Sequence, residues 1–164
     1  MLRLIQILCL AALSFAAPAA AQDVQISFGS SLRLENSALE ITADSLEVDQ
    51  TTGASIFSGN VVATQGDMRI SAQSLNLNYV DGAREGSRRI GSLVAQGGVT
   101  MVTSAEAIEA QQAIFNMAEQ TLEMTGDVVL AQGVNLLSGE RFVADLRTGT
   151  GRMVGRVRTI IQVD

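Results

Sequence analysis

A six-residue frame that recurs four times constrains the fold of this chain more than any other feature. Its copies are ITADSL, ISAQSL, IEAQQA and LSGERF, which start at Ile41, Ile70, Ile108 and Leu137. A glycine-x-valine piece follows 18 residues after the frame start in three copies and 27 residues after it in the second. Regular spacing of this kind is typical of a chain built from copies of one supersecondary unit. The sequence therefore predicts four internal repeats.

Apolar residues alternate within each frame, which indicates β-strands, but the alternation slips once at the same place. Apolar positions fall at the frame start and two residues later, and then at five and seven residues after the start, except that Gly139 replaces the alanine of the fourth copy. A step of three would turn the second half of the strand to the other face, so we expect a bulge or corner there. The residue three after the start is polar in every copy: Asp44, Gln73, Gln111 and Glu140.

We interpret this polar position as an outward bulge residue whose side chain can meet freed backbone groups. A ring of carboxylates that binds a metal is the alternative, and it is disfavoured because two of the four residues are glutamines. The stretch from Ala105 to Gln112 contains helix-forming residues, but its match to the strand frame outweighs local propensity. We therefore expect an all-β fold with about three or four short antiparallel strands in each copy. Stacked copies would place apolar side chains in columns, such as Ile41/Ile70/Ile108/Leu137, Val48/Leu77/Phe115/Ala144 and Phe57/Ala95/Met124/Met153.

The first 21 residues have the composition of a secretory signal. Arg3 precedes an apolar run from Leu4 to Phe15, and Ala19-Ala20-Ala21 before Gln22 fits a small-residue cleavage site. An uncleaved membrane anchor is the alternative, but it needs roughly 20 apolar residues. We therefore expect a cleaved signal at residues 1–21 and one mature domain at residues 22–164.

Composition argues against several classes of function. The mature chain contains no histidine, cysteine or lysine, because Cys9 lies in the signal and every basic residue is an arginine. The usual general bases, nucleophiles and metal ligands are missing, so we expect no enzyme, no metal site and no cofactor. A carboxylate pair such as Asp44 and Asp49 is the remaining catalytic candidate, and exposed strand and turn acids explain it better. A net charge of −6 argues against nucleic acid as a partner.

The segment from Ile41 to Tyr79 resembles a known family. Its sequence ITADSLEVD, followed by FSGNVVATQG and MRISAQSLNL, is similar to the OstA-type domain of the LptA family, which belongs to the lipopolysaccharide transport bridge. The resemblance extends through the internal copies over almost all of the mature chain. It implies an open, twisted β-jellyroll in the periplasm, whose apolar interior shields the acyl chains of lipid A. It also implies head-to-tail assembly with copies of the same chain, and contact with an LptC-like inner-membrane protein and an LptD-like outer-membrane translocon.

The inward-facing apolar positions are the candidate lipid-binding residues. A carrier of acyl chains needs a continuous apolar lining, because each buried methylene gains about 0.8 kcal/mol. The alternative is that these side chains pack against one another as a core, and periodicity alone does not distinguish the two. The candidates are Ile41, Val48, Phe57, Val61, Ile70, Leu75, Leu77, Val99, Ile108, Phe115, Met124, Val128, Leu137, Phe142 and Met153.

The C-terminal segment is the candidate assembly edge. It is rich in β-branched residues and free of proline, so it could add to another sheet. Residues 22–69 carry seven acids and two arginines, whereas residues 137–164 carry five arginines and three acids, so opposite ends should attract. Solvated arginines that prevent pairing are the alternative. The candidate edge residues are Arg156, Val157, Arg158, Ile160, Ile161 and Val163.

Other functions fit the same repeats. A self-assembling structural β-solenoid would show the same strands but a filled interior and no lipid path. An LptC-like domain and a related carrier of a different glycolipid are further alternatives. The interior separates carrier from solenoid, because a carrier must leave room for lipid.

Overall fold

The computed structural model describes residues 24–27, 37–81 and 88–161, and within these ranges the chain forms strands and turns without a helix. The predicted signal at residues 1–21 and the candidate edge residue Val163 lie outside the described residues. The strands are β1 (Val24–Ser27), β2 (Glu40–Thr42), β3 (Ser45–Val48), β4 (Ser55–Gln65), β5 (Met68–Asp81), β6 (Arg88–Val102), β7 (Glu106–Asn116), β8 (Thr121–Gln132), β9 (Asn135–Asp145), β10 (Thr150–Val154) and β11 (Arg158–Ile160).

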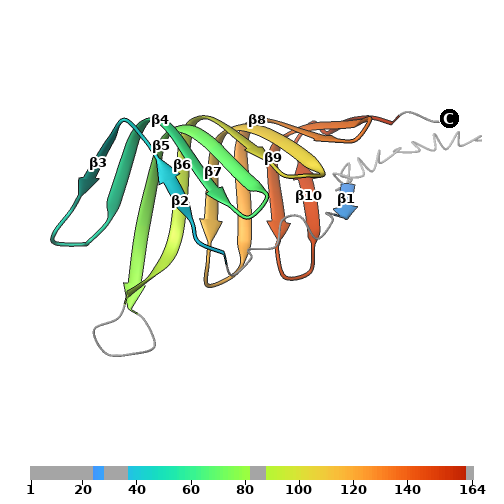
Figure 1. The fold of residues 1–164 in the computed structure, drawn as a ribbon. Helices are drawn as coiled ribbons and strands as arrows, with labels where there is room; N and C mark the ends of the chain where they lie inside the picture. The colour runs from blue at the N-terminus through green and yellow to red at the C-terminus, as the bar shows by residue number, and fades with distance from the viewer. Residues whose placement is uncertain (1–23, 28–36, 82–87, 162–164) are drawn as a thin grey trace, which may run out of the picture.

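The eleven strands form one antiparallel sheet, which confirms the all-β prediction. From β4 to β9, strands that follow one another in the sequence pair with one another. At one end of the sheet β2 and β3 both pair with β4, and near the other end β10 and β11 both pair with β9. The two ends do not pair with each other among the described strands, so the sheet is open (Figure 1).

A bulge interrupts each of the strands β4 to β8. The register shifts between Ser58 and Val61 in β4 and between Ser71 and Ser74 in β5, and corresponding shifts occur in β6, β7 and β8. In β5 and β7 the shift falls where the frame alternation slips, as predicted. Figure 1 shows the strands bending over along the upper side of the view.

The bulges divide the sheet into two sides. The β2 side consists of residues 40–42, 61–65, 68–72, 99–102, 106–110, 128–132, 135–139 and 158–160. The β3 side consists of residues 24–27, 45–48, 55–58, 74–81, 88–96, 112–116, 121–125, 141–145 and 150–154. Because the strands bend at the bulges, apolar side chains from both sides point into one interior.

The glycine of each glycine-x-valine piece forms the corner on the neighbouring strand. Gly97 and Gly126 have φ values of 85° and 87°, in the left-handed region that favours glycine. A Cβ at Gly126 would also lie 2.7 Å from the Cβ of Gln111, and one at Gly97 would lie 2.7 Å from the Cβ of Gln73. The polar residue three after the frame start therefore lies against this glycine. Both the backbone conformation and the close approach require a residue without a side chain.

The polar bulge residues are exposed, as predicted, but the side chains of those at the two outer corners accept hydrogen bonds from other side chains and not from backbone groups. Asp44 accepts a hydrogen bond from Asn60 Nδ2 at 2.8 Å. Glu140 accepts one from Arg156 Nε at 2.9 Å. Each donor is the residue directly after the corner glycine, so a hydrogen bond joins the bulge residue to the corner of the neighbouring strand.

The strands are longer than the sequence suggested. We expected three or four short strands in each copy, whereas β5 has 14 residues and β6 has 15. A bulge leaves the hydrogen-bonded ladder continuous on both sides of the extra residue, so one strand extends around the corner. The second and third frames with the stretches that follow them therefore form two long strands each.

The predicted columns coincide with ladders of paired residues. Ile41, Ile70, Ile108 and Leu137 lie on one ladder of the β2 side. The other two columns lie on two inward-facing ladders of the β3 side that are two residues apart along each strand. The ladder of the Phe57 column passes through Leu46, Phe57, Leu75, Ala95, Ala113, Met124, Phe142 and Met153. Most of these side chains are buried in one continuous core.

Candidate functional site

An apolar pocket opens into the interior near the β2 end of the sheet. It contains about 310 Å³ of space free of protein atoms, part of which is open to solvent. The β2 side contributes Ala63, Gln65, Met68 and Ile70, together with Leu39 just before β2. The β3 side contributes Leu93 and Phe115, and Met117 follows β7. The pocket thus lies between the two facing sides of the sheet.

The described side chains of the interior are fully buried toward the other end of the sheet. Met124, Phe142 and Met153 have no exposed surface, and neither do Leu122 and Leu130. In this region the side chains pack against one another, as in an ordinary core. The apolar interior therefore has an accessible part between β2 and β7 and a closed part from β8 to β10.

The structure separates the fifteen predicted lining residues into groups. Twelve are buried in the core, and of these only Ile70 and Phe115 line the pocket. Ile41 and Phe57 are partly buried and pack against the core. The pocket also uses residues that the frames did not select: Leu39, Ala63, Gln65, Met68, Leu93 and Met117. Leu93 lies on the ladder of Leu77 and Phe115, so counting alternate residues along β6 would have found it.

Val48 does not lie inside the interior. Its side chain is 56% exposed, and that of Leu46 on the same strand is 54% exposed. Both residues occupy inward-facing ladders, but β3 is the last strand on this side of the sheet and no further strand covers them. The position on an edge, and not the direction of the side chain, explains the exposure.

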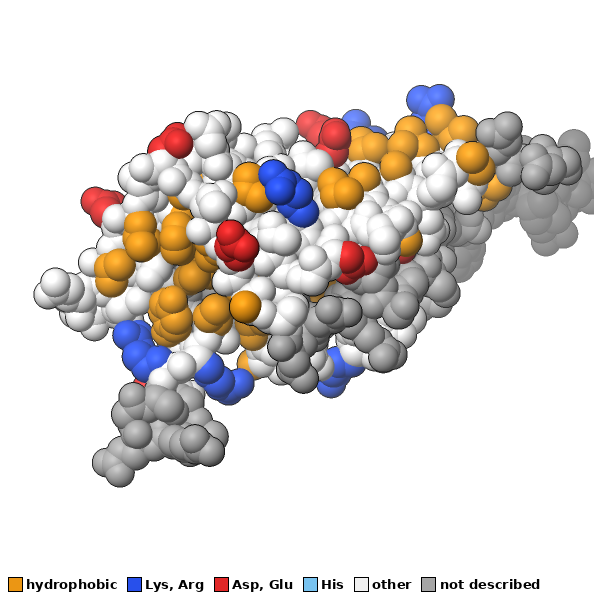
Figure 2. Space-filling model, in the orientation of Figure 1, with side chains coloured by type: hydrophobic (Ala, Val, Ile, Leu, Met, Phe, Trp, Pro, Cys, Tyr) orange, Lys and Arg blue, Asp and Glu red, His pale blue; other side chains and the backbone are white. Residues whose placement is uncertain are grey.

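The two ends of the sheet expose apolar side chains. Leu46 and Val48 lie at the β3 end, whereas Leu136, Ile160 and Ile161 are exposed near β11. Figure 2 shows hydrophobic side chains gathered over the β3 end at the left and again at the upper right, toward the C-terminus. Apolar surface that gathers at an edge makes that edge a candidate for contact with another molecule.

The charges at the two ends are opposite. β2, β3 and the residues beside them carry four exposed acids and no base: Glu40, Asp44, Glu47 and Asp49. β10, β11 and their connection carry three exposed arginines: Arg152, Arg156 and Arg158. Arg156 forms an ion pair of 2.9 Å with Glu140 of its own chain, which offsets part of the positive charge.

The predicted C-terminal strand is shorter than expected and is not a simple free edge. Only Arg158–Ile160 is a strand, β11, and it pairs with Leu136, Leu137 and Ser138 of β9. Arg156 and Val157 form the corner between β10 and β11, and Arg156 has a positive φ of 41°. This corner corresponds to the bulges of the other strands, which is why the predicted strand from Arg156 onward is interrupted.

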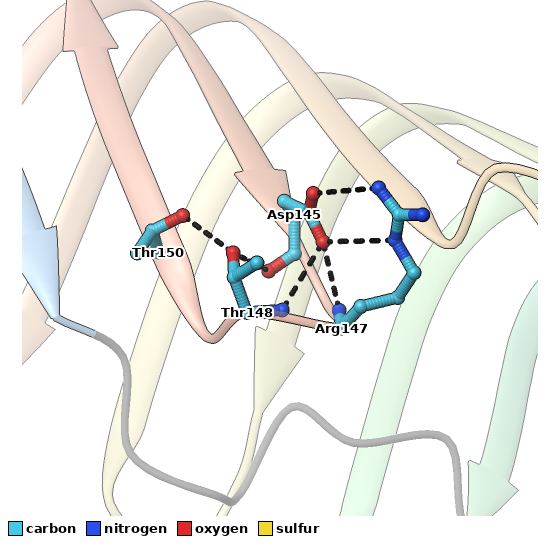
Figure 3. Close-up of polar contacts among 4 residues, drawn as sticks. All are labelled: Asp145, Arg147, Thr148 and Thr150. Atoms are coloured by element: carbon cyan, nitrogen blue, oxygen red, sulfur yellow. Dashed lines mark hydrogen bonds and ion pairs between the residues drawn. The ribbon is translucent and has the colours of Figure 1, made fainter.

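Carboxylates organise two hairpin turns on the β3 side. Asp145 accepts hydrogen bonds from the backbone amides of Arg147 at 2.9 Å and Thr148 at 3.2 Å, and from the Arg147 guanidinium at 3.1 Å (Figure 3). The guanidinium and these amides lower the pKa of Asp145, and the same pair raises the pKa of Arg147. Asp49 accepts from the amides of Thr51 and Thr52 in the turn between β3 and β4, which lowers its pKa. Both turns fix hairpins and perform no chemistry.

No polar cluster suited to catalysis lines the pocket. Within the described ranges no group of three or more histidine, cysteine, aspartate or glutamate side chains could hold a metal ion. The same residues contain no helix that is long and apolar enough to cross a membrane. The pocket can bury apolar groups, and its lining offers one polar side chain, Gln65.

Comparison with known proteins agrees with this architecture. The crystal structure of LptH from Pseudomonas aeruginosa, described as the LptA homologous periplasmic component of the lipopolysaccharide transport device, is similar with a TM-score of 0.68. The match covers 77% of this chain and 96% of LptH at 16% identity, so it shows a shared fold. An uncharacterized protein, R00383, from Rhizobium meliloti (strain 1021) is 28% identical over 159 residues, which make up 92% of this chain and 84% of the relative.

A family match covers most of the sheet. Residues 40–150 match the model of the LptA/(LptD N-terminal domain) LPS transport protein family, from β2 to the first residue of β10. This family is a non-enzymatic transport family. The chain therefore belongs to the LptA/(LptD N-terminal domain) family of lipopolysaccharide transport proteins.

Proposed function

We propose that this protein carries lipopolysaccharide through the periplasm by shielding the acyl chains of lipid A in the interior of its sheet. The pocket between Met68 and Phe115 carries the proposal, because it opens an otherwise packed apolar interior to the outside. An acyl chain of about a dozen methylenes would lose on the order of 10 kcal/mol of shielding in water. A continuous apolar lining avoids this cost, because the acyl chain stays out of water along its whole path.

The pocket is suited to irregular acyl chains. Met68 and Met117 contribute flexible side chains that adapt to different shapes, and Ala63 leaves room beside them. In the closed part of the interior Met124 and Met153 are also unbranched, so lipid could displace them without moving the backbone. The accessible part is therefore the entry, and the closed part becomes the remainder of the path when lipid is bound.

The proposed location is the periplasm, reached through a signal at residues 1–21 that is cleaved before Gln22. The signal composition and the fold shared with LptH, a periplasmic protein, support this proposal. Intact-mass measurement of the exported protein should give a chain that begins at Gln22. A protein that retains Met1 in the membrane fraction would favour the LptC-like alternative.

End-to-end assembly would join this protein to further copies and to the related domains of an LptC-like and an LptD-like partner. Exposed apolar side chains at both ends and acids facing arginines support a head-to-tail contact. A contact between two different surfaces propagates into a filament. Such a filament would continue the interior from one copy to the next.

A matched pair of neighbours on β7 tests the lipid path. Phe115 is buried and lines the pocket, whereas Ile114 next to it is 37% exposed on the outer face. A photo-crosslinking amino acid at each position should give lipopolysaccharide adducts in cells from residue 115 and none from residue 114. Absence of adducts from residues 93 and 115 alike would favour the structural solenoid. Adducts with another glycolipid would keep the carrier and change its cargo.

A further inference from the structure

β1 occupies a position at the far end of the sheet from its neighbours in sequence. It pairs antiparallel with β10, with Val24 opposite Met153 and Ser27 opposite Thr150. β2, the next strand in the sequence, lies at the opposite end of the strand order. Figure 1 shows β1 beside β10 at the right of the view, whereas β3 lies at the left.

The register of β1 reproduces that of β3. At the left end, Leu46 and Val48 of β3 occupy the two inward-facing ladders of the β3 side that pass through Met153 and Gly151 of β10. At the right end, Val24 and Ile26 of β1 occupy positions on the same two ladders, opposite Met153 and Gly151. Both strands therefore place β-strand-forming apolar residues, two apart, at the same ladders.

The direction of β1 is also that of β3. Strand direction alternates across the sheet, so β3 of a second copy placed beside β10 in continuous order would be antiparallel to it. β1 is antiparallel to β10. A second copy and β1 would therefore compete for the same backbone groups of β10 in the same orientation.

We propose that β1 is an intramolecular mimic of β3 that covers β10 and limits end-to-end assembly until it is displaced. The proposal rests on the head-to-tail contact of the proposed function and adds a regulated step to it. With β1 in place, the backbone groups of β10 that β3 of a second copy would need are already paired, and β11 offers β2 of that copy three residues. With β1 released, β10 and β11 together accept β3 and β2 of the next copy.

The hold of β1 on the sheet fits this role. It forms four residue pairs with a single strand, and β2 and β11 form three each. β2 and β11 continue through short corners into β3 and β10, which are themselves paired, whereas residues 27 and 150 of the β1–β10 pair lie far apart in the sequence. A short pairing between distant segments is weaker than a hairpin of the same length, because closing the longer loop costs more entropy.

Deletion of Val24–Ser27 tests the proposal. Sedimentation velocity of the exported protein across a concentration series should show tighter self-association after the deletion, by tenfold or more in the dissociation constant. Circular dichroism and thermal melting identify a variant that has failed to fold. Equal association of the folded deletion variant and the unchanged protein would overturn the proposal.

A reversible lock gives a second test on a single molecule. Ser27→Cys combined with Thr150→Cys places two thiols at paired positions of adjacent strands, and the mature chain contains no other cysteine. The oxidised form should associate at least tenfold more weakly than the reduced form, with each single-cysteine variant as control. Identical association of oxidised and reduced forms would overturn the proposal that β1 limits assembly and would leave the proposed end-to-end contact untouched. Monomers at all concentrations in every form, including the deletion variant, would overturn both the role of β1 and the proposed end-to-end assembly.

Discussion

Met153 lies so close to Gly139 that a Cβ at residue 139 would come 2.6 Å from its Cγ and 2.9 Å from its Sδ. The other three frames have alanine at this position, so the fourth frame lacks a methyl group at the place where Met153 packs. Gly139→Ala should destabilise the protein by about 1–3 kcal/mol through overpacking of the closed interior. Denaturant unfolding measures the change. In a Met153→Ala background the same substitution should cost less than about 0.5 kcal/mol, and an undiminished cost would place its origin elsewhere.

A second prediction compares two glycines with positive φ. Gly126 forms a corner against Gln111, whereas Gly133 in the β8–β9 turn has no atom within 4 Å of the place where a Cβ would be. Alanine at either position adopts a left-handed conformation, at about 1–2 kcal/mol. Gly126→Ala should cost about 1–3 kcal/mol more than Gly133→Ala because it also displaces Gln111. Equal losses of unfolding free energy would show that the close approach at the corner is unimportant.

A buried arginine should have different effects in the two parts of the interior. Phe115 lines the open pocket, so an arginine there can extend its guanidinium toward water. Met124 has no exposed surface, and an arginine there leaves an unpaired charge at a cost of several kcal/mol. Phe115→Arg should keep the far-ultraviolet circular dichroism of the native protein and lose lipopolysaccharide binding, whereas Met124→Arg should unfold. Unfolding of both variants to the same extent would count against an open pocket.

Removal of the C-terminal strand should weaken assembly. A chain that ends at Gly155 lacks β11, so Leu136 and Leu137 of β9 keep their pairing with β8 but lose the strand on their other side. Light scattering across concentration should show open-ended oligomers of the full-length protein and at least tenfold weaker association of the truncated chain. Growth that is equal in both would exclude β11 as a contact surface. Weakening of the full-length oligomers by salt would identify the charge difference between the ends as a contributor.

Acid should destabilise the protein partly through Asp145. Its folded-state pKa is lowered, chiefly by the hydrogen bond from Arg147, so its stabilising effect is present above the unfolded pKa of about 3.9. That effect is lost as the pH falls through the folded-state value. Asp145→Asn should therefore lower the melting temperature at neutral pH and flatten its decline below about pH 4. Glu109→Gln, which removes an exposed carboxylate of β7, is the control, and an equally flat profile for both would contradict the assignment.

The alternation of apolar and polar residues within each frame predicted the corners and the ladders, because both depend on residues that are close together in the sequence. The step of three between Ala72 and Leu75 reports a bulge directly, and like residues in successive frames fall on one ladder once that bulge is counted. The role of the corner glycines was not predicted. Their contact with Gln73 and Gln111 joins neighbouring strands and appears only when the register between strands is known.

The position of β1 could not be predicted, because its four residues carry no frame and its partner is at the other end of the chain. The division of the interior also depends on the whole fold. Phe115 and Met124 have the same apolar character and the same inward direction, yet Phe115 lines the apolar pocket near the β2 end and Met124 does not. Alternation indicates which way a side chain points, whereas the space in front of it depends on the facing side of the sheet.

The pairing of each strand from β4 to β9 with its sequence neighbours makes the length of the interior a modular quantity. One more hairpin would lengthen the sheet by about 9.6 Å, since adjacent strands lie about 4.8 Å apart. It would leave the cross-section unchanged, because the corners fix the angle of every strand separately. Stability in such an array is approximately a sum of terms between adjacent strands, so unfolding should begin by fraying at the terminal hairpins. Evolution could therefore adjust the reach of this protein by duplicating or deleting hairpins, without redesigning the walls of its interior.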